Sequence, residues 1–425
     1  MRILAVGDIH LGARPSRLPS EFRDQSGQYG PSQAWRRTVQ TAIDRNVQAV
    51  VLAGDVVDND DDFFEGYREL SREVKRLRSH GIGVFGVAGN HDVLVLPRLA
   101  AEVPDFTLLG AGGQWECVQI EHSGQTAHIW GWSFPEAKVT SSPLRGVKLD
   151  RRSGVNIGFL HCDLDQSGSP YAPVASGELE ATDFDAWFLG HIHMPGTLTA
   201  DRPFGYLGSL TGTDPGEPGV HGPWLINIEG NRIVGCEQIP LAPIQWRALK
   251  VDLTGLQDPN DVSSRLIGAI RLLDQEISAD SPMSDLVGLR VALVGRSRHG
   301  SASKKVLADA TADGQTIEVG TSIQYFVEKI HVRNTPEVHL EELAQRPDPA
   351  GLLAARILIL DRSADDPERR QLIARATAQL AGVQDQQRFS GIEPRSFDDS
   401  TVTKILRNAG MQLLEQMQIQ VGDAQ

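Results

Sequence analysis

Five short segments of the sequence could bind metal ions, because they combine imidazole, carboxylate and amide side chains. They are Gly7-Asp8-Ile9-His10, Gly54-Asp55, Gly89-Asn90-His91-Asp92, His161, and Gly190-His191-Ile192-His193. Each segment follows an apolar run of the length expected for a buried strand. Because ligands gather beyond the carboxyl ends of strands in layered α/β folds, we expect the five segments to converge on one site.

The donor atoms in these segments suit a pair of metal ions. The candidate ligands are Asp8, His10, Asp55, Asn90, His161, His191 and His193. One ion does not need seven protein ligands, whereas two ions that share a bridging carboxylate do. Two ions ~3.5–4 Å apart can clamp a phosphate and activate the water that attacks it. The mixture of nitrogen and oxygen donors suits manganese, iron or zinc better than calcium.

The spacing within the segments supports this interpretation. Asp8 and His10 are two residues apart, as are His191 and His193, and side chains at that spacing on extended backbone share a face. A glycine before a ligand lets the backbone turn tightly and approach a bound ion. An isolated Asp-x-His or Gly-Asn-His-Asp is usually only a turn. The specific signal is the full set, in this order, with each member at a strand end.

The surrounding pattern predicts the elements that would position these residues. Apolar runs predict strands over 3–7, 47–54 and 81–89, and helical periodicity predicts helices over 34–43 and 63–77. Beyond residue 115 we expect a second sheet that faces the first, with strands over 117–121, 127–132, 155–161, 187–190 and 224–228. The acidic run 58–62 is interpreted as a loop or a helix start.

A domain boundary is predicted at 240–243, where prolines interrupt the pattern. We expect an α/β chain with a two-sheet αββα sandwich over 1–240, a small α/β capping domain over 244–335 and a mainly helical region over 336–425. The last helix should begin after Asp398-Asp399-Ser400, which are favoured N-cap residues. Its apolar stripe consists of Val402, Ile405, Leu406, Ala409, Leu413 and Met417.

Composition narrows the class of protein. The chain has 425 residues, three cysteines and a net charge of −14, from 41 Lys and Arg against 55 Asp and Glu. No stretch approaches the ~20 apolar residues that cross a bilayer. We therefore expect a soluble cytoplasmic protein with no membrane span and no disulfide scaffold. The acidic balance counts against a protein that coats nucleic acid non-specifically, although local basic clusters could still contact phosphates.

The order Asp-x-His, Gly-Asp, Gly-Asn-His-Asp, His, Gly-His-x-His resembles the calcineurin-like metallophosphoesterase superfamily. Further motifs resemble its SbcD-type DNA double-strand-break repair nucleases, including the YhaO-like branch. These motifs are Asp8-Ile9-His10-Leu11-Gly12, Tyr171 followed by Phe184-Asp185, and Tyr206-Leu207-Gly208-Ser209. The resemblance implies an αββα metallophosphoesterase sandwich with two divalent ions, Mn²⁺ first among the candidates.

The resemblance also implies roles for individual residues. One metal would be held by Asp8, His10, Asp55 and His193, and the second by Asp55, Asn90, His161 and His191. His91 would act on the leaving oxygen and Asp92 would orient it, so these two are the expected catalytic residues. Protein phosphatases of the superfamily carry an arginine shortly after the bridging aspartate, where this chain has Asn59. That departure favours a phosphodiester substrate.

The expected function is therefore a metal-dependent DNA nuclease, an exonuclease with endonuclease activity also considered. By the same resemblance it would work with an SbcC-type coiled-coil ATPase and dimerise through the helix over 63–77. Candidate DNA contacts are Arg14, Arg17, Arg151, Arg152, Arg296 and Arg298. Two alternatives remain open: a phosphodiesterase for small molecules or cyclic nucleotides, and a non-catalytic tether of DNA ends.

Overall fold

The computed structural model describes residues 1–279, 284–297, 299–311, 315–334, 340–384 and 397–422. The chain divides into two compact units. The first contains Met1–Lys250, Ser263–Ala292 and Leu307–His331, and the second contains Val251–Val262, Leu293–Val306 and Val332–Gln425.

In the described part of the first unit, one sheet has the strand order β11-β10-β1-β2-β3-β4. β1 to β4 are parallel to one another, whereas β10 is antiparallel to β1 and to β11. The carboxyl ends of β1, β2 and β3 therefore lie at the same edge. The strands are β1 (Arg2–Val6), β2 (Ala49–Ala53), β3 (Gly83–Val87), β4 (Phe106–Leu108), β10 (Trp224–Glu229) and β11 (Arg232–Gln238).

A second sheet has the order β5-β6-β7-β8-β9. β5 and β6 are antiparallel, and the remaining neighbours are parallel, so that β7 and β8 also end at one edge. The strands are β5 (Trp115–His122), β6 (Gln125–Trp132), β7 (Val155–His161), β8 (Ala186–Gly190) and β9 (Phe204–Tyr206).

The two sheets pack face to face, and strand alternation shows how. In β1, Ile3 and Ala5 belong to the apolar cluster between the sheets, together with Phe159 of β7. Leu4 and Val6 point the other way, into the cluster beneath the helices. Because both faces of the first sheet are covered, its strands are apolar throughout rather than alternating.

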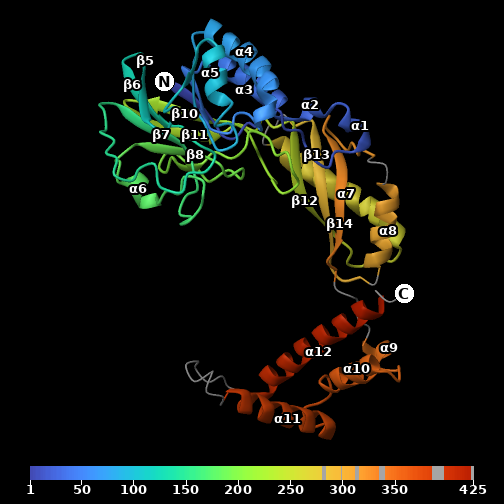
Figure 1. Cartoon of the computed structure of the whole chain (residues 1–425). Coiled ribbons are helices and arrows are strands. Elements are labelled where there is room, and N and C mark those ends of the chain that lie inside the picture. The colour runs from blue at the N-terminus through green and yellow to red at the C-terminus, as the bar shows by residue number, and fades with distance from the viewer. Residues whose placement is uncertain (280–283, 298, 312–314, 335–339, 385–396, 423–425) are drawn as a thin grey trace. The chain divides into compact units, whose positions relative to one another are not determined.

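Helices cover the outer face of the first sheet (Figure 1). Leu70, Val74 and Leu77 of α4 are buried against it at helical spacing. On the outer side of the second sheet, Leu179 of α6 packs in a cluster with Trp187. The helices of this part are α1 (Ser20–Arg23), α2 (Ser26–Tyr29), α3 (Pro31–Asp44), α4 (Phe63–Ser79), α5 (Leu96–Glu102) and α6 (Ser176–Glu180), with the short helix η1 (Asp60–Asp62) before α4.

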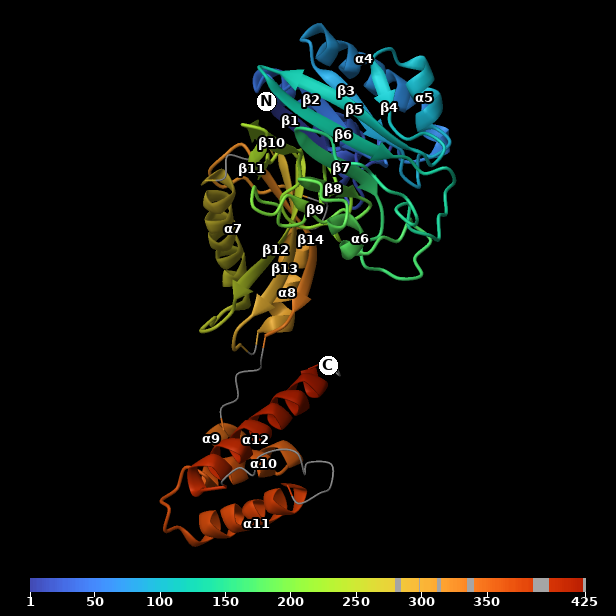
Figure 2. The same cartoon turned by 90° about the vertical axis from the view of Figure 1, so that its left-hand side faces the viewer.

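A third, three-stranded sheet has the order β12-β13-β14, and α7 lies against it (Figure 2). The buried Asp274 of α7 accepts hydrogen bonds from the hydroxyl groups of Tyr325 (2.8 Å) and Thr321 (2.6 Å). Trp246 of β12 packs with Phe22, which precedes α2. The elements are β12 (Ile244–Asp252), η2 (Pro259–Asp261), α7 (Val262–Ala279), β13 (Leu286–Val294), α8 (Gly300–Ala310) and β14 (Gln324–Val332).

The last part of the second unit is helical (Figure 2). Leu414 of α12 packs with Ile357 of α10, and Val402 at the start of α12 packs with Ile373 of α11. No helix among the described residues is long and apolar enough to cross a membrane. The helices are α9 (Leu340–Leu343), α10 (Pro349–Ile359), α11 (Pro367–Gln384) and α12 (Asp399–Gly422).

The predicted α/β sandwich with a further α/β segment and C-terminal helices is confirmed, with one strand misplaced. The run 224–228 was expected in the second sheet but forms β10, which pairs with β1 in the first. β4 and β9 were not predicted, because three residues are too few to show a period. The domain boundaries near 240 and 335 stay predictions.

Candidate metal centre

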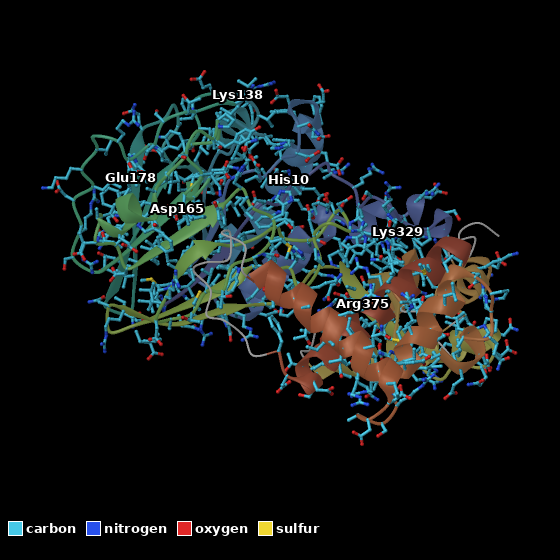
Figure 3. The ribbon with its side chains drawn as sticks, turned by 90° about the horizontal axis from the view of Figure 1, so that it is seen from below. His10, Lys138, Asp165, Glu178, Lys329 and Arg375 are labelled. Atoms are coloured by element: carbon cyan, nitrogen blue, oxygen red, sulfur yellow. The ribbon has the colours of Figure 1, made fainter. Side chains whose placement is uncertain are left out.

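The five sequence segments meet where the carboxyl ends of strands from both sheets converge. Asp8 and His10 follow β1, Asp55 follows β2, and Asn90 follows β3. His161 is the last residue of β7, next to Gly190 at the end of β8. The label of His10 marks this place in Figure 3. The seven candidate ligands therefore lie at or just beyond the carboxyl ends of parallel strands, β1 to β3 in the first sheet and β7 and β8 in the second.

Hydrogen bonds fix the segments to one another across the sandwich. The backbone N–H groups of Ile9 and His10 both donate to the Asp55 carbonyl, at 3.1 and 2.9 Å. The backbone N–H of His191 donates to Asp8 Oδ1 at 2.8 Å, which links a loop of the second sheet to one of the first. The site thus belongs to both sheets, and neither sheet alone could form it.

Among the described residues, three groups of side chains have donor atoms close enough to share a cation, with the ligand atoms of each within 4.8 Å of one another. Asp8, His10 and His193 form the first group, Asp55, His161 and His191 form the second, and His10, Asp58 and His91 form a third at the edge of the cluster. Asn90 joins the second group, because its Oδ1 lies 3.0 Å from His161 Nε2. Asp55 Oδ2 lies 3.2 Å from His161 Nε2 and 3.9 Å from His10 Nε2. Asp55 is therefore placed between the first two groups, where a bridging ligand would be.

The chemistry of these atoms fits two divalent cations. Asp8 is fully buried, and its Oδ2 has no hydrogen-bond partner among the described residues. A buried carboxylate oxygen without a partner carries a large desolvation cost, which a bound cation would remove. His10 Nε2 lies 3.0 Å from His193 Nε2, and a carboxylate oxygen of Asp8 lies within 4.8 Å of a ring nitrogen of each histidine. These three atoms provide the ligands that one metal position needs.

The charges of the site make it favourable for cations. Burial would lower the pKa of His161, but the charges of Asp55 and Asp8 outweigh burial and raise that pKa to about 9. Burial would raise the pKa of Asp55, yet the charge and hydrogen bond of His161 hold that pKa below its usual value. Burial, with the charge of Asp55, raises the pKa of Asp92 to about 7. The raised pKa values of His161 and Asp92 reflect nearby negative charge, and the lowered pKa of Asp55 reflects its pairing with His161.

The four candidate ligand histidines each have one ring nitrogen that faces away from the cluster toward an acceptor. The acceptors are Asp58 for His10 (3.0 Å), the Ala53 carbonyl for His161 (3.2 Å), Asp163 for His191 (3.4 Å) and Glu217 for His193 (2.5 Å). Such acceptors hold the outer proton and turn the other nitrogen toward a metal. The pattern is what metal-binding histidines require.

His91 lies at the edge of the cluster, where a substrate could reach it. Its backbone N–H donates to Asp55 Oδ1 at 3.0 Å, and its ring centroid lies 5.1 Å from that of His10. Its Nδ1 lies 3.0 Å from the carbonyl oxygen of Asp58. Because a carbonyl only accepts, Nδ1 carries the proton, and Nε2 is left to act on a substrate.

Asp92 does not orient His91 as expected. Its fully buried carboxylate accepts hydrogen bonds from the backbone N–H groups of Val56 (2.7 Å) and Gly89 (2.8 Å). It therefore ties the loop after β2 to the loop after β3, and the Asp58 carbonyl contacts the His91 ring in its place. Asp92 acts through the backbone of the ligand loops, not through the imidazole.

Three residues important for the arrangement were not singled out as site residues from the sequence. Asp58, in the run interpreted as an acidic loop, contacts His10, whereas Asp163 and Glu217 contact His191 and His193. Asp163 lies two residues beyond His161, which is a weak signal. Glu217 lies 24 residues beyond its partner, so no local pattern marks it.

The arginines predicted to contact DNA differ in the contacts that they make within the protein. Arg14 and Arg17 line a pocket described under the proposed function. Arg151 forms an ion pair with Asp185 at 3.0 Å, and the Arg152 guanidinium lies over the Trp130 ring. Arg296 is exposed but belongs to the second unit, and Arg298 lies outside the described residues. Their assignment as DNA contacts stays a prediction.

The backbone around the ligands is strained, and glycines make room for it. His10, Asp55 and His191 have positive φ angles of 55°, 45° and 97°, which cost about 1–3 kcal/mol each. A Cβ atom on Gly190 would clash with the carbonyl oxygen of Ala53 and would lie 2.8 Å from His161 Nδ1. The close approach of the two sheets at this point therefore depends on a missing side chain.

We expect Gly190→Ala to lower the free energy of unfolding by about 1–3 kcal/mol, because the added methyl group overpacks a rigid junction. Gly177→Ala is the matched control, since a Cβ there meets no atom within 4 Å. Urea unfolding followed by tryptophan fluorescence measures both variants. Equal stability of the two would contradict the steric argument.

Comparison with known proteins agrees with this geometry. The family model described as "Calcineurin-like phosphoesterase" matches residues 1–195, which include every candidate ligand. The protein named "Uncharacterized metallophosphoesterase YhaO" from Bacillus subtilis is 27% identical over 223 residues, covering 52% of this chain and 54% of that protein. The "DNA double-strand break repair protein Mre11" of Aeropyrum pernix is 28% identical over 273 residues, covering 59% of this chain and 64% of that protein.

The chain thus spans between half and two thirds of the length of these two relatives. A solved structure described as a dimetal phosphatase from Danio rerio covers 56% of this chain and 96% of its own, with 13% identity and a TM-score of 0.36. Because this TM-score is low, the comparison with known proteins depends on the sequence matches. Together with the ligand pattern that they carry, these matches confirm the resemblance of residues 1–195 to calcineurin-like metallophosphoesterases.

Proposed function

We propose that the protein is a metal-dependent DNA nuclease that hydrolyses phosphodiester bonds, with Mn²⁺ as the preferred metal. The observation that carries the proposal is the pair of ligand groups with Asp55 placed between them and His91 beside them. The names of its Mre11 relatives refer to DNA double-strand break repair, which makes DNA the first substrate to test. Exonuclease action is the form we expect.

The residues present would hold the two ions as the family resemblance implies. Asp8, His10 and His193 would contribute to one position, His161 and His191 to the other, and Asp55 to both, with Asn90 at the second. When bound, the ions would supply Lewis acidity toward the phosphate oxygens and lower the pKa of water.

The chain's own contribution to the reaction centres on His91. Its Nδ1–H is held by the Asp58 carbonyl, which leaves Nε2 without that partner and able to contact a substrate. In the protonated ring, Nε2 would donate its proton to the oxygen that leaves when the P–O bond breaks. A general acid in this position contributes about 10²–10⁴-fold to a rate.

We expect His91→Ala to reduce cleavage of end-labelled linear duplex DNA in Mn²⁺ by about 10²–10⁴-fold, because the leaving oxygen loses its proton donor. Metal binding, measured by calorimetry, should stay intact, because His91 belongs to neither of the two ligand groups that we propose to hold the ions. His122→Ala, on an exposed histidine at the end of β5, is the control and should cleave like the unaltered protein.

Bis-nitrophenyl phosphate, assayed in parallel, separates the alternatives. Turnover of this small diester with DNA left intact would favour the small-molecule phosphodiesterase, or a nuclease that requires its ATPase. DNA binding with no hydrolysis of either substrate, even with both metals bound, would favour the non-catalytic tether. If His91→Ala cleaved DNA as fast as the unaltered protein does, the proposed role of His91 would be wrong.

A basic pocket gives the proposal a candidate path for the DNA backbone. Arg14, Arg17 and Arg23 line a cavity of about 400 Å³ with the buried Ser26 at its wall. Within the described residues, none of the three guanidinium groups has a carboxylate within ion-pair distance. Arg14 contacts Ser26 Oγ at 3.4 Å, and Arg23 donates to the Leu18 carbonyl at 3.3 Å. Arginines in this state are available to phosphate oxygens.

The pocket is fixed to the metal centre through the backbone. The N–H of Ala13 donates to the His10 carbonyl, and the N–H of Ser16 donates to the Thr213 carbonyl. Arg17 is seven residues beyond His10, so its Cα lies at most about 25 Å away. At about 3.4 Å per nucleotide along one strand, this distance corresponds to at most about seven nucleotides from the cleaved bond.

Replacing Arg14 and Arg17 together by alanine should weaken DNA binding. The slope of the logarithm of the binding constant against the logarithm of the salt concentration should become shallower by about two, because two fewer phosphate charges are neutralised. Hydrolysis of the small diester should not change, because neither residue touches the metal ligands. Arg202 and Arg232 are exposed and away from the pocket, and their double alanine variant is the control. Fluorescence anisotropy over a range of salt concentrations measures the slope, and an unchanged slope would exclude this path.

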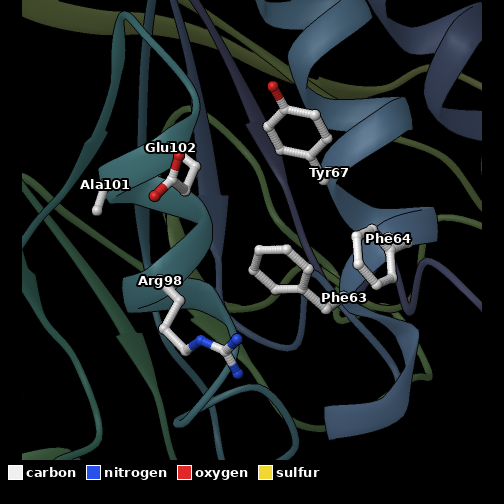
Figure 4. A pocket seen from close by; sticks show the side chains of 6 residues that line it. All are labelled: Phe63, Phe64, Tyr67, Arg98, Ala101 and Glu102. Carbon is white, nitrogen blue, oxygen red and sulfur yellow. The ribbon is translucent and has the colours of Figure 1, made fainter.

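A homodimer is part of the proposal, through the surface of α4 and α5. Phe64 is 82% exposed and lies beside a pocket of about 450 Å³ lined also by Phe63, Tyr67, Arg98, Ala101 and Glu102 (Figure 4). The Arg98 guanidinium lies 4.7 Å from the centroid of the Phe63 ring. A two-fold axis would place Phe64 of each copy near the pocket of the other, because isologous interfaces pair identical patches.

We expect Phe64→Glu to convert a dimer into a monomer in sedimentation experiments, because it would bury an unpaired charge. Ser79→Glu, exposed at the other end of the same helix, is the control and should remain dimeric. A monomeric unaltered protein, or a dimeric Phe64→Glu variant, would count against this interface.

The proposed ATPase partner would contact α12. Of the predicted stripe, Val402, Leu406 and Met417 face the other helices, whereas Ile405 and Leu413 are 37% and 45% exposed. This outward apolar face suits a helix of a coiled-coil ATPase, which would lay its own apolar side along it.

The double variant Ile405→Glu/Leu413→Glu should therefore bind a purified SbcC-type coiled-coil ATPase at least about tenfold more weakly, as loss of an interface anchor does. Lys404→Glu on the adjacent exposed position is the control for added negative charge. Calorimetry with the purified ATPase gives both affinities, and equal values would exclude this face of α12.

A further inference from the structure

Glu217, the acceptor for the outer ring nitrogen of His193, lies in the loop between β9 and β10. Its Oε1 is 2.5 Å from His193 Nδ1, and its Oε2 accepts a hydrogen bond from the backbone N–H of Thr213 at 2.7 Å. Because both oxygens are used, the carboxylate is held in one orientation toward the imidazole.

The loop that carries Glu217 is itself rigidly held. The ring nitrogens of the fully buried His221 lie 3.1 Å from the carbonyl oxygens of Ser209 and Glu217. Trp246 Nε1 of β12 donates to the Gly212 carbonyl at 3.0 Å. The backbone N–H of Ser209 also donates to the His193 carbonyl at 2.8 Å. The loop is therefore attached both to His193 and to the third sheet.

This arrangement decides which nitrogen of His193 is free. A carboxylate accepts a hydrogen bond and does not donate one, so His193 Nδ1 must carry the proton and Nε2 must present its lone pair. Asp58 imposes the same state on His10. The two Nε2 atoms are 3.0 Å apart, so in neutral rings that carry their protons on Nδ1 the two lone pairs face each other. Asp8 Oδ2 is buried with no described partner. A cation between these atoms relieves the repulsion.

We propose that Glu217 is a positioning residue that keeps His193 in the Nδ1–H state and thereby sets the affinity of the metal position formed with Asp8 and His10. This inference rests on the proposed metal centre but not on the identity of the substrate. Glu217 contacts the His193 ring directly and would act on the metal position through it.

Calorimetric titration of the metal-free protein with Mn²⁺ tests this role without any reaction being followed. In Glu217→Ala, one of the two binding events should weaken by about 10–100-fold, and the other should change little. Glu217→Gln keeps an acceptor oxygen for Nδ1–H and should stay within about tenfold of the unaltered protein. Glu237→Ala, an exposed glutamate of β11, is the control and should bind both ions normally.

Two results would overturn the inference: unchanged affinities in Glu217→Ala, or equal losses in Glu217→Ala and Glu217→Gln. If the unaltered protein binds no divalent ion, the proposed metal centre itself is wrong. If it binds two ions and cleaves DNA while Glu217→Ala also binds two with full affinity, only the role of Glu217 fails. The two failures are thus distinguishable.

A second measurement needs no Glu217 variant and so does not depend on that variant folding. The ring ¹⁵N signals of the metal-free protein report which nitrogen of each histidine is protonated. The signal of His193, assigned by its loss in His193→Gln, should show a protonated Nδ1. A protonated Nε2 with a bare Nδ1 would overturn the inference.

Discussion

Three buried carboxylates in one small volume are the constraint on which the rest of the site depends. Asp8, Asp55 and Asp92 are at most 2% exposed, and the charge of Asp55 adds to burial in raising the pKa of Asp92. Asp92 is accommodated by backbone N–H groups of two loops, and Asp55 by His161 and the N–H of His91. Asp8 receives one N–H and keeps one oxygen without a described partner. The protein therefore compensates this negative charge only in part, and cations would complete the compensation.

The arrangement that gathers these charges is stiff because it is built on strands and not on long loops. The ligand residues follow directly on buried strands, and the strained backbone of His10, Asp55 and His191 is held by hydrogen bonds between loops. Such strain persists only where the surroundings over-determine it. The interior of both sheets thus supports the geometry of the metal centre.

The metal centre accounts for phosphoester hydrolysis in general, whereas the choice of substrate depends on surfaces outside it. A two-metal phosphoesterase site does not by itself choose between DNA and a small diester, because fold and metals are shared by many activities. We propose that the basic pocket around Arg17 contributes to this choice, and that the exposed Phe64 and the outward face of α12 bind partners. None of these surfaces takes part in the hydrolysis itself. In our proposal they bind the substrate or a partner.

The sequence by itself determined the class of fold and the candidate ligands. Each candidate ligand such as Asp8, Asp55 or His161 stands at the end of an apolar run of strand length. This pattern identifies both the strand and the residue at its end, because the residues involved are neighbours in the sequence. The helices over 34–43 and 63–77 were equally visible, because their apolar residues recur at the helical period.

Only the tertiary structure decided which distant residues complete the site. Glu217 reaches His193 through a loop held by Trp246, and Asp92 contacts the backbone of two loops instead of the expected imidazole. Likewise, β10 could join the first sheet because strand pairing is set by the route of the chain and not by strand composition. These contacts join residues far apart in the sequence, and their distances are fixed only when both sheets have packed.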